Sequence, residues 1–368
     1  MSRRGRAVFV DFYDYRNVGD DLLFVTLARR YPHVPFDYIG DKTDGATFAG
    51  LPNVRRLARV PYVDGVLRRL RLPVRVNDLR RRLRVRRSPL VVRLGGSLYM
   101  ERGDWRRNAA LDGDLVRGGT PAFFLNGNFG PWETDEFLAT YERIFSLARD
   151  VTVRDAASLE QLRAVGIVRL APDMLFCVPP APASQTRQGV VVSVIDLSDR
   201  AGLSAWTDGY EAAMADLVID LVARGEAVTL VSFCPLEGDE AAISRVLARI
   251  PEASRGSVST HLYDGDLDAV LAVLRRAGTI VATRFHAMVL GVAFGARVCC
   301  VEYSDKLSNA LRDLDATSLG WTLPDFVGAT RAERLARVSS LEAVDIPGIA
   351  ARAGAHFSVL DEYLGAPA

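Results

Sequence analysis

Short apolar runs alternate with stretches of amphipathic helical spacing along most of the chain, and this alternation limits the fold more than any other feature. Strands joined by helical crossovers form parallel sheets, because each connection must return to the edge where the previous strand began. The runs expected as strands in the first half are 7–12, 90–94, 121–126 and 150–153, and the helical stretches are 20–30, 134–148 and 158–164. The first half is therefore predicted to be Rossmann-like.

The second half repeats this rhythm after a segment that contains three prolines. The strands expected there are 190–195, 227–233, 279–283 and 298–301, and the helices are 210–223, 240–250, 267–276 and 287–294. With 368 residues the chain exceeds the usual size of a single hydrophobic core. We predict an α/β protein of two Rossmann-like domains facing a cleft, with domains over 1–180 and 189–368 and a linker at about 178–188.

Composition excludes several classes of protein. The 46 Lys and Arg side chains balance 45 Asp and Glu side chains, so the overall positive charge of a nucleic-acid-binding protein is missing. The four cysteines form no Cys-x-x-Cys pair, and the sequence contains neither a metal-binding cluster nor a Walker loop. The longest uncharged apolar run, 285–296, is shorter than a membrane-spanning helix. We expect a cytoplasmic protein without metal or cofactor.

One segment departs from this charge balance. Between residues 55 and 93 the sequence has 14 arginines and only two acidic residues, Asp64 and Asp78. The segment fits a solvated helical face, and it equally fits contact with anionic lipid or a lipid-linked diphosphate at the inner face of the plasma membrane. Nucleic acid fits less well, because few aromatic side chains lie between the arginines.

Two glycine-containing loops follow predicted strands of the first half. Asn17, Gly19 and Asp20 lie after the first strand, and Gly95 and Gly96 lie after the strand at 90–94. Glycine permits tight turns, and the backbone amides at a helix N-terminus suit an anionic or polyhydroxyl ligand. Simple helix capping by Asp20 explains the first loop as well.

An arginine closes the strand at 150–153. Arg154 is expected at the mouth of the predicted cleft, where a guanidinium can bind a carboxylate or phosphate through two hydrogen bonds. A structural ion pair with Asp155 or Asp173 is an equally good interpretation.

The second half has two polar clusters at predicted strand ends. Arg284 and His286 lie between the strand at 279–283 and an apolar helix, and side chains two residues apart face the same way in an extended chain. Glu302, Tyr303 and Lys306 follow the next strand. Because parallel strands end at one edge of a sheet, both clusters are expected to line one cationic pocket.

These motifs stand in a characteristic order along the chain. They are Asn17-x-Gly19-Asp20, Gly95-Gly96, Gly130-Pro131, Val153-Arg154-Asp155-x-x-Ser158, Pro172-Asp173, Arg284-Phe285-His286-Ala287 and Tyr303-x-x-Lys306. The ordered set resembles the polysaccharide pyruvyl transferase family over most of the chain, although Ser97 stands where the family often has a third glycine and Phe285 where it commonly has leucine.

The resemblance implies a GT-B-like fold and transfer of pyruvate from phosphoenolpyruvate to a glycan or lipid-linked oligosaccharide as a cyclic ketal, in the biosynthesis of exopolysaccharide or cell envelope. It assigns phosphoenolpyruvate to Arg154, Arg284 and His286. We expect Lys306 to be a further cation of this site and protonated His286 to act as the general acid. The residues left for the acceptor or for support of the site are Asn17, Gly19, Asp20, Gly95, Gly96, Glu302 and Tyr303, of which Asp20 and Glu302 are candidate bases.

Two other functions remain open at this point. A GT-B glycosyltransferase would use the same basic residues to hold the diphosphate of a nucleotide sugar. A non-catalytic protein would bind an anionic glycan or lipid through the arginine segment at 55–93.

Overall fold

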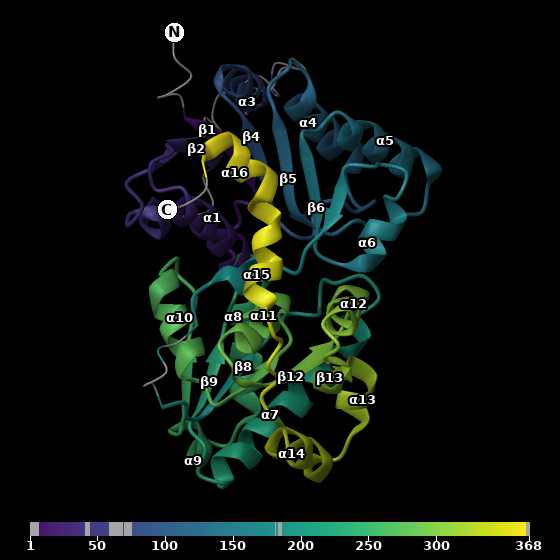
Figure 1. Cartoon of the computed structure of the whole chain (residues 1–368). Helices are drawn as coiled ribbons and strands as arrows, with labels where there is room; N and C mark the ends of the chain where they lie inside the picture. The colour runs from purple at the N-terminus through teal and green to yellow at the C-terminus, as the bar shows by residue number, and fades with distance from the viewer. Residues whose placement is uncertain are drawn as a thin grey trace. The chain divides into compact units, whose positions relative to one another are not determined.

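The computed structural model describes residues 7–40, 45–58, 69, 76–180, 182 and 186–365, and the chain divides into two compact units (Figure 1). Unit 1 comprises Met1–Asp14, Asp20–Met174 and Arg352–Ala368, and unit 2 comprises Tyr15–Gly19 and Leu175–Ala351. Each unit is built on a parallel sheet whose successive strands are joined mostly through helices. The predicted α/β class with two Rossmann-like halves is confirmed.

The sheet of unit 1 has the strand order β3-β2-β1-β4-β5-β6-β7. Its strands are β1 (Val8–Phe12), β2 (Phe36–Gly40), β3 (Val54–Ala58), β4 (Val91–Leu94), β5 (Ala122–Gly127), β6 (Asp150–Val153) and β7 (Val168–Leu170). Its helices are α1 (Val18–Arg30), α3 (Val76–Arg87), α4 (Trp105–Val116), α5 (Asp135–Ser146), α6 (Ala156–Gln161) and α16 (Ser358–Leu364). The order reverses between β1 and β4, and the loops beyond such a reversal are where doubly wound sheets bind ligands.

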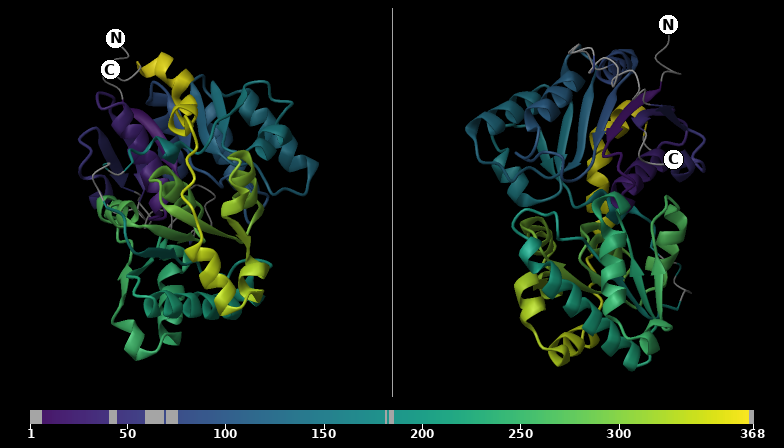
Figure 2. Two further views of the ribbon diagram at one scale, coloured as in Figure 1. Left: turned by 60° about the horizontal axis from the view of Figure 1, so that its bottom comes forward. Right: turned by 180° about the vertical axis from the view of Figure 1, so that it is seen from behind.

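Alternation along β5 explains how helices cover both faces of this sheet. Successive side chains of a strand point to opposite faces, so Phe124 packs among the aromatic rings of α5, with Phe145 at 5.3 Å between ring centroids. Phe123 meets Tyr363 of α16 at 5.3 Å. Figures 1 and 2 accordingly show α4 and α5 on one face of the sheet and the C-terminal helix on the other.

The sheet of unit 2 has the strand order β10-β9-β8-β11-β12-β13. Its strands are β8 (Val190–Ser193), β9 (Val228–Val231), β10 (Val258–His261), β11 (Thr279–Ala282), β12 (Arg297–Glu302) and β13 (Gly320–Thr322). Its helices are α7 (Thr207–Ala223), α8 (Asp239–Arg249), α9 (Glu252–Arg255), α10 (Leu267–Arg276), α11 (Phe285–Ala293), α12 (Asp305–Asp313), α13 (Leu323–Gly328) and α14 (Arg331–Ser339), while α15 (Ile349–Gly354) leads back to unit 1. Apolar side chains of α7, α8, α13 and α14 form one core with β8.

The strands expected from apolar runs are present within a few residues of their expected bounds, whereas β2, β3, β7, β10 and β13 were not predicted. β3 shows why: its sequence is Val-Arg-Arg-Leu-Ala, and it lies at the sheet edge, where arginine side chains reach solvent. Its Arg55 bonds Asp37 of β2. An edge strand stabilised by an ion pair lacks the apolar pattern that marks central strands.

Every helix of the described residues is too short or too polar to cross a bilayer.

The division of the chain differs from the predicted domains in two places. The unit boundary falls at Met174, a few residues before the expected linker at 178–188, of which residues 181 and 183–185 lie outside the described part. The segment from Arg352 onward was expected in the second domain but belongs to unit 1. Its polar contacts explain this, because Asp361 accepts bonds from both Arg30 and Tyr31 at 2.6 to 3.0 Å.

His356 anchors the same segment from inside unit 1. It is fully buried, with Nδ1 at 2.7 Å from the Thr152 hydroxyl and Nε2 at 2.8 Å from the Pro172 carbonyl. A carbonyl only accepts, so Nε2 carries a proton. Burial is the main reason that the pKa of His356 falls to about 4.

This buried imidazole predicts a pH-dependent stability of unit 1. Between pH 6.5 and 4 the unfolded chain binds a proton that folded His356 does not, so stability falls as pH falls, by up to ~3 kcal/mol across the window. Hydrogen exchange of β6 and α16 at pH 7 and pH 5, corrected for intrinsic rates, measures the effect. His356→Gln should be less protected at pH 7 but should lose less protection at pH 5; an identical pH response would contradict the assignment.

Candidate functional site

A buried ion pair joins the ends of β9 and β11 in unit 2. Arg284 is the N-cap residue of α11 and is 7% exposed, and its Nε lies 3.0 Å from Asp239 Oδ2. Asp239 is completely buried and also accepts hydrogen bonds from the backbone amides of Phe233 and Cys234 at 2.9 Å each. The pair therefore fixes the loop after β9 against the start of α11.

A second carboxylate completes this cluster. Glu237 Oε2 lies 2.5 Å from Arg284 Nη1 and 2.8 Å from Arg200 Nη2. Burial alone would raise the pKa of Glu237, but the two guanidinium groups outweigh it and lower the pKa to about 2. Glu237 is thus ionised near neutral pH. The predicted role of Arg284 in donor binding stays a prediction, since its guanidinium already bonds two carboxylates.

His286 is the second residue of α11 and is partly exposed. The sequence suggested that Arg284 and His286 project the same way from an extended chain, and this is wrong because the helix begins at Phe285. The two side chains engage different partners: Arg284 bonds Asp239, whereas the imidazole lies against Gly19. A Cβ atom at Gly19 would overlap the ring.

The loop that carries Gly19 is held within unit 2 by its backbone. Val18 N donates to Phe233 O at 2.9 Å, and Gly19 N donates to the Asn17 side chain at 3.0 Å. The positive φ of this loop belongs to Arg16, at 50°, and not to the glycine. Gly19 is therefore needed for the close approach of the imidazole and not for a turn. Gly19 thus contacts both the Asn17 side chain and the His286 ring.

A group of cations and rings follows β12. Lys306 Nζ lies 5.8 Å from the ring centroid of Tyr303 and 5.9 Å from that of Phe285, and Arg200 Cζ lies 5.6 Å from Tyr303. Burial would raise the pKa of the Tyr303 hydroxyl, but Lys306, Arg200 and Arg284 together lower it below its usual value. Among the described residues no carboxylate lies within ion-pair distance of Lys306. Sequence reasoning missed Arg200, which lies in an irregular turn after β8 without a motif.

The two candidate bases occupy different surroundings. Glu302, at the end of β12, accepts a hydrogen bond from Ser308 and lies so close to Gly320 that a side chain there would overlap it. Asp20 is 8% exposed in the first turn of α1 of unit 1 and lies near Gly95, whose φ of 145° requires glycine. The structure thus does not bring the two carboxylates together within one unit.

Arg154 forms the corresponding buried pair in unit 1. Its side chain is 2% exposed, Nη1 lies 2.7 Å from Asp173 Oδ2, and Nε lies 2.6 Å from Asn128 Oδ1. Of the two acidic partners considered from the sequence, Asp173 provides this ion pair, while Asp155 caps α6 by accepting from Ser158 N at 2.7 Å. A side chain at position 96 would overlap the Arg154 guanidinium, so Gly96 is required by close packing.

Two buried asparagines of this site were not predicted. Asn126 donates to Asp173 at 3.1 Å and accepts from Met174 N at 2.8 Å, while Asn128 bonds both Arg154 and Asp155. The sequence Asn126-Gly127-Asn128 directly after an apolar run was the available signal. Asn126 thus orients the carboxylate that holds Arg154, and Asn128 bonds the guanidinium itself.

Comparison with known proteins identifies the chain at this point. The model of the polysaccharide pyruvyl transferase family matches residues 17–305, well over half of the sequence. The chain belongs to this family. The match includes Arg154, Arg284 and His286 and ends at Asp305, directly before Lys306. Membership confirms the resemblance drawn from the ordered motifs and shows a transferase of polysaccharide biosynthesis.

Solved structures show the same architecture at low sequence identity. A protein described as a UDP-N-acetylglucosamine 2-epimerase from Listeria monocytogenes aligns with a TM-score of 0.57 and 11% identity, over 97% of this chain and 96% of its own. The α,α-trehalose-phosphate synthase of Burkholderia xenovorans gives 0.51 and 12%, over 97% and 96%. The trehalose-6-phosphate synthase OtsA gives 0.51 and 11%, over 98% and 99%. The likeness shows a GT-B fold. No curated protein sequence matches the chain.

Because Gly19 packs directly on the His286 ring, we predict that adding one methyl group at position 19 displaces this ring. Gly19→Ala should displace the imidazole and reduce turnover by about 100-fold, because small misplacements of a reacting group have effects of that size. The side-chain NMR signals of His286 and the steady-state rate measure this. Gly256→Ala, at a glycine with open space around it and φ of −61°, is the matched control and should change neither. Unshifted His286 signals in Gly19→Ala would show that the contact does not position the ring.

Proposed function

We propose that the protein transfers pyruvate from phosphoenolpyruvate to two hydroxyls of a sugar, within a polysaccharide or a lipid-linked oligosaccharide, and releases phosphate. Family membership supports pyruvyl transfer. The observation that carries the proposal is the position of His286, partly exposed at the N-terminus of α11 and packed on Gly19. That position suits a proton donor to a small anionic substrate.

The cations of unit 2 suit the donor's phosphate and carboxylate. Lys306 offers an ammonium group with no carboxylate partner among the described residues, and Arg200 is partly exposed. The first amides of α11 add their dipole to the attraction for an anion. Arg284 and, in unit 1, Arg154 remain proposed donor-binding residues, and their bonds to Asp239 and Asp173 keep each guanidinium in place.

The chemistry follows from these groups. His286, in its protonated form, delivers a proton to the methylene carbon of phosphoenolpyruvate, which becomes a methyl group, and positive charge develops at the carbon that bears phosphate. The donor's two anionic groups favour the protonated imidazole. A sugar hydroxyl attacks that carbon and loses its proton. Phosphate then leaves with its bonding electron pair, and a second hydroxyl attacks the same carbon to close the ketal. Asp20 and Glu302 are the two candidates for accepting the hydroxyl protons.

The two alternative functions, glycosyl transfer and non-catalytic binding, require different residues and ligands. A glycosyltransferase of the same GT-B fold would hold a nucleoside diphosphate sugar and would need sites for the ribose and base. A non-catalytic protein would bind an anionic glycan or lipid and would depend on the arginines of 55–93 and not on His286.

Ligand-induced stabilisation separates these functions. Millimolar phosphoenolpyruvate should raise the melting temperature, since a ligand at a hundred times its Kd adds ~2.7 kcal/mol of stability, whereas UDP- and GDP-sugars should change it little. Lys306→Gln should lose most of the response. Arg312→Gln, an exposed arginine of the same helix, is the matched control and should keep it.

The choice of Lys306 follows from the structure. Arg284→Ala would leave Asp239 buried without its counter-ion, which typically costs about 3–5 kcal/mol, so a lost response could reflect unfolding. If a nucleotide sugar stabilises the protein and phosphoenolpyruvate does not, the proposed function is wrong and glycosyl transfer is the better assignment.

Turnover tests the role of His286 itself. His286→Gln should remain folded and bind phosphoenolpyruvate, but release phosphate about 10²- to 10⁴-fold more slowly, because glutamine supplies no proton. Phosphate release in the presence of acceptor glycan measures the rate. His33→Gln, at an exposed histidine of unit 1, should be unaffected. A folded His286→Gln variant with near-normal turnover would refute the acid role.

A further inference from the structure

We propose that one face of unit 1, formed by the outer side of α3 and the adjoining surface of α4 and α5, is a docking surface for an anionic lipid bilayer. The centre of this surface is the α3 stripe, which we define as Leu79, Arg82, Leu83, Arg86 and Arg87. All five side chains are exposed. The proposal is independent of pyruvyl transfer, although a lipid-linked acceptor would be met at such a surface.

The α3 stripe is the side of an amphipathic helix opposite its buried residues. Arg81 and Val85 point into unit 1, where Arg81 bonds Asp11 and the Leu111 carbonyl. On the outer side Leu79 is 48% exposed and Leu83 is 42% exposed, one helical turn apart. Large apolar side chains next to arginines on an exposed helical face are typical of segments that lie in a membrane interface.

The charges of this surface face outward. Arg82 is 53% exposed and Arg117 is 67% exposed, whereas the side chain of Asp114, which pairs with both, is only 9% exposed. Arg86, Arg87 and Arg143 are exposed, and among the described residues none of them has an ion-pair partner. The Asp114 carboxylate thus lies beneath the guanidinium groups of Arg82 and Arg117, whereas Glu136 in the groove between α4 and α5 is 57% exposed and pairs with Arg106.

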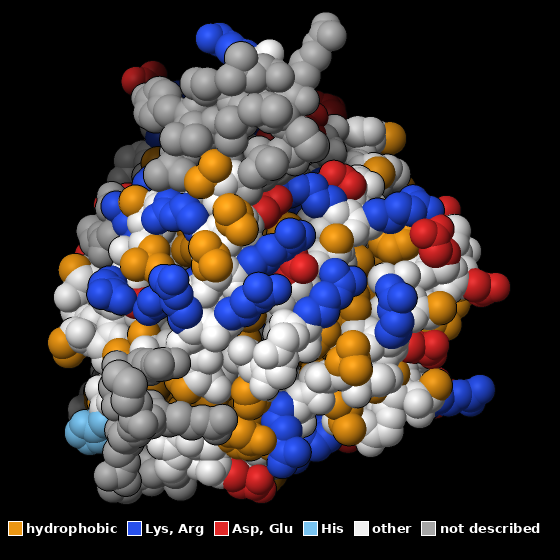
Figure 3. Space-filling view, turned by 90° about the horizontal axis from the view of Figure 1, so that it is seen from above, with side chains coloured by type: hydrophobic (Ala, Val, Ile, Leu, Met, Phe, Trp, Pro, Cys, Tyr) orange, Lys and Arg blue, Asp and Glu red, His pale blue; other side chains and the backbone are white. Residues whose placement is uncertain are grey.

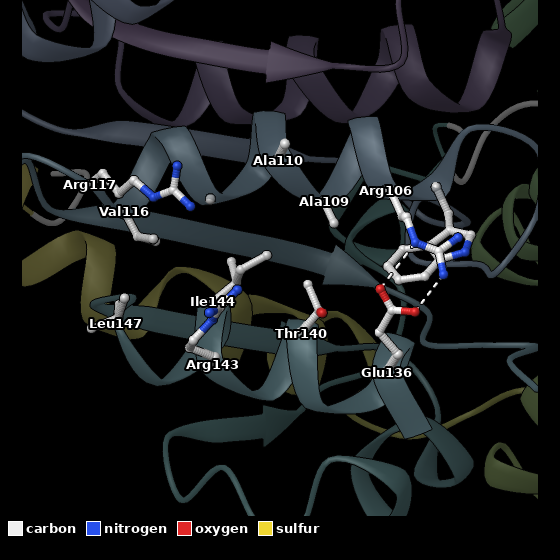
Figure 4. Close-up of a pocket in the computed structure, with 12 residues that line it drawn as sticks. Arg106, Ala109, Ala110, Val116, Arg117, Glu136, Thr140, Arg143, Ile144 and Leu147 are labelled. Carbon is white, nitrogen blue, oxygen red and sulfur yellow. Dashed lines mark hydrogen bonds and ion pairs between the residues drawn. The ribbon is translucent and has the colours of Figure 1, made fainter. Parts of the chain in front are cut away.

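The surface continues from α3 across α4 to α5. Arg86 lies beside Gly118, directly after α4, and Arg117 reaches toward Ile144 of α5 across Gly113. Between α4 and α5 runs a groove of about 390 Å³ with Arg117 and Arg143 at its rim, shown in Figure 4. Figure 3 shows a band of basic side chains interspersed with hydrophobic and some acidic ones. Leu147, at the end of the groove, is 63% exposed.

The structure also reduces the number of arginines between residues 55 and 93 that are available to bind a lipid. Arg55 and Arg84 pair with the buried carboxylate of Asp37, and Arg93 pairs with Asp112. Those arginines support the fold. Other arginines of the segment, such as Arg59 and Arg75, lie outside the described residues. Among the described residues, the α3 stripe presents exposed arginines of this segment that can reach phosphates, and Arg117 and Arg143 of the neighbouring helices add to them. Its two leucines favour a bilayer over a soluble polyanion, which offers them no apolar phase.

Cosedimentation of the full chain with vesicles tests the proposal. The protein should bind vesicles of phosphatidylglycerol mixed with phosphatidylcholine, more strongly at low salt, and should not bind phosphatidylcholine alone. Since each arginine near an anionic surface contributes about fivefold, the triple variant Arg86→Gln, Arg87→Gln, Arg143→Gln should bind about 100-fold more weakly. The matched control exchanges three exposed arginines of unit 2, Arg224, Arg276 and Arg312, for glutamine and should bind as the wild type does.

A second variant distinguishes a bilayer from other polyanions. Leu79→Gln with Leu83→Gln keeps every charge, and it should weaken vesicle binding while leaving binding to soluble heparin unchanged. Circular dichroism confirms that each variant is folded. The proposal is wrong if the triple variant and its unit 2 control lose vesicle binding to the same extent. It is also wrong if the leucine variant binds vesicles as the wild type does, and this second result would indicate a surface for soluble polyanions.

Discussion

The ion pair between Arg284 and Asp239 is the interaction on which the candidate site of unit 2 depends. Both groups are buried, so each is stable only in the presence of the other. Asp239 also holds the amides after β9, while Ser193 Oγ accepts from the backbone amides of Thr283 and Arg284 at 3.0 and 3.1 Å. Together these bonds fix the residue at which α11 begins, and hence where His286 lies.

Unit 1 uses the same device with different residues. Arg154 and Asp173 form its buried pair, Asn126 and Asn128 orient the two ends, and Gly96 makes room for the guanidinium. His356 supports this arrangement from the C-terminal segment by bonding Thr152 and the Pro172 carbonyl. A residue close to the end of the chain therefore takes part in building a site that forms at the ends of β5 and β6.

The basic side chains fall into three groups by burial. Buried arginines such as Arg154 and Arg284 neutralise carboxylates and hold strand ends in place. Partly exposed cations, Arg200 and Lys306, lie over the ring of Tyr303. The exposed arginines Arg82, Arg86 and Arg87 of α3 face solvent. The formal net charge of the chain, which is near zero, does not reveal this separation by burial.

The sequence by itself determined the α/β class, most central strands and the family, because buried parallel strands need continuous apolar runs and the site motifs follow them directly. It also indicated His286, Arg284 and Arg154. Only the tertiary structure decided what each of them touches: that Gly19 serves the approach of His286, that Asp239 and Asp173 occupy the arginines, and that residues from 352 onward complete unit 1. The physical reason is that ion pairs and close packing join residues far apart in the chain, and local pattern carries no information on such pairings.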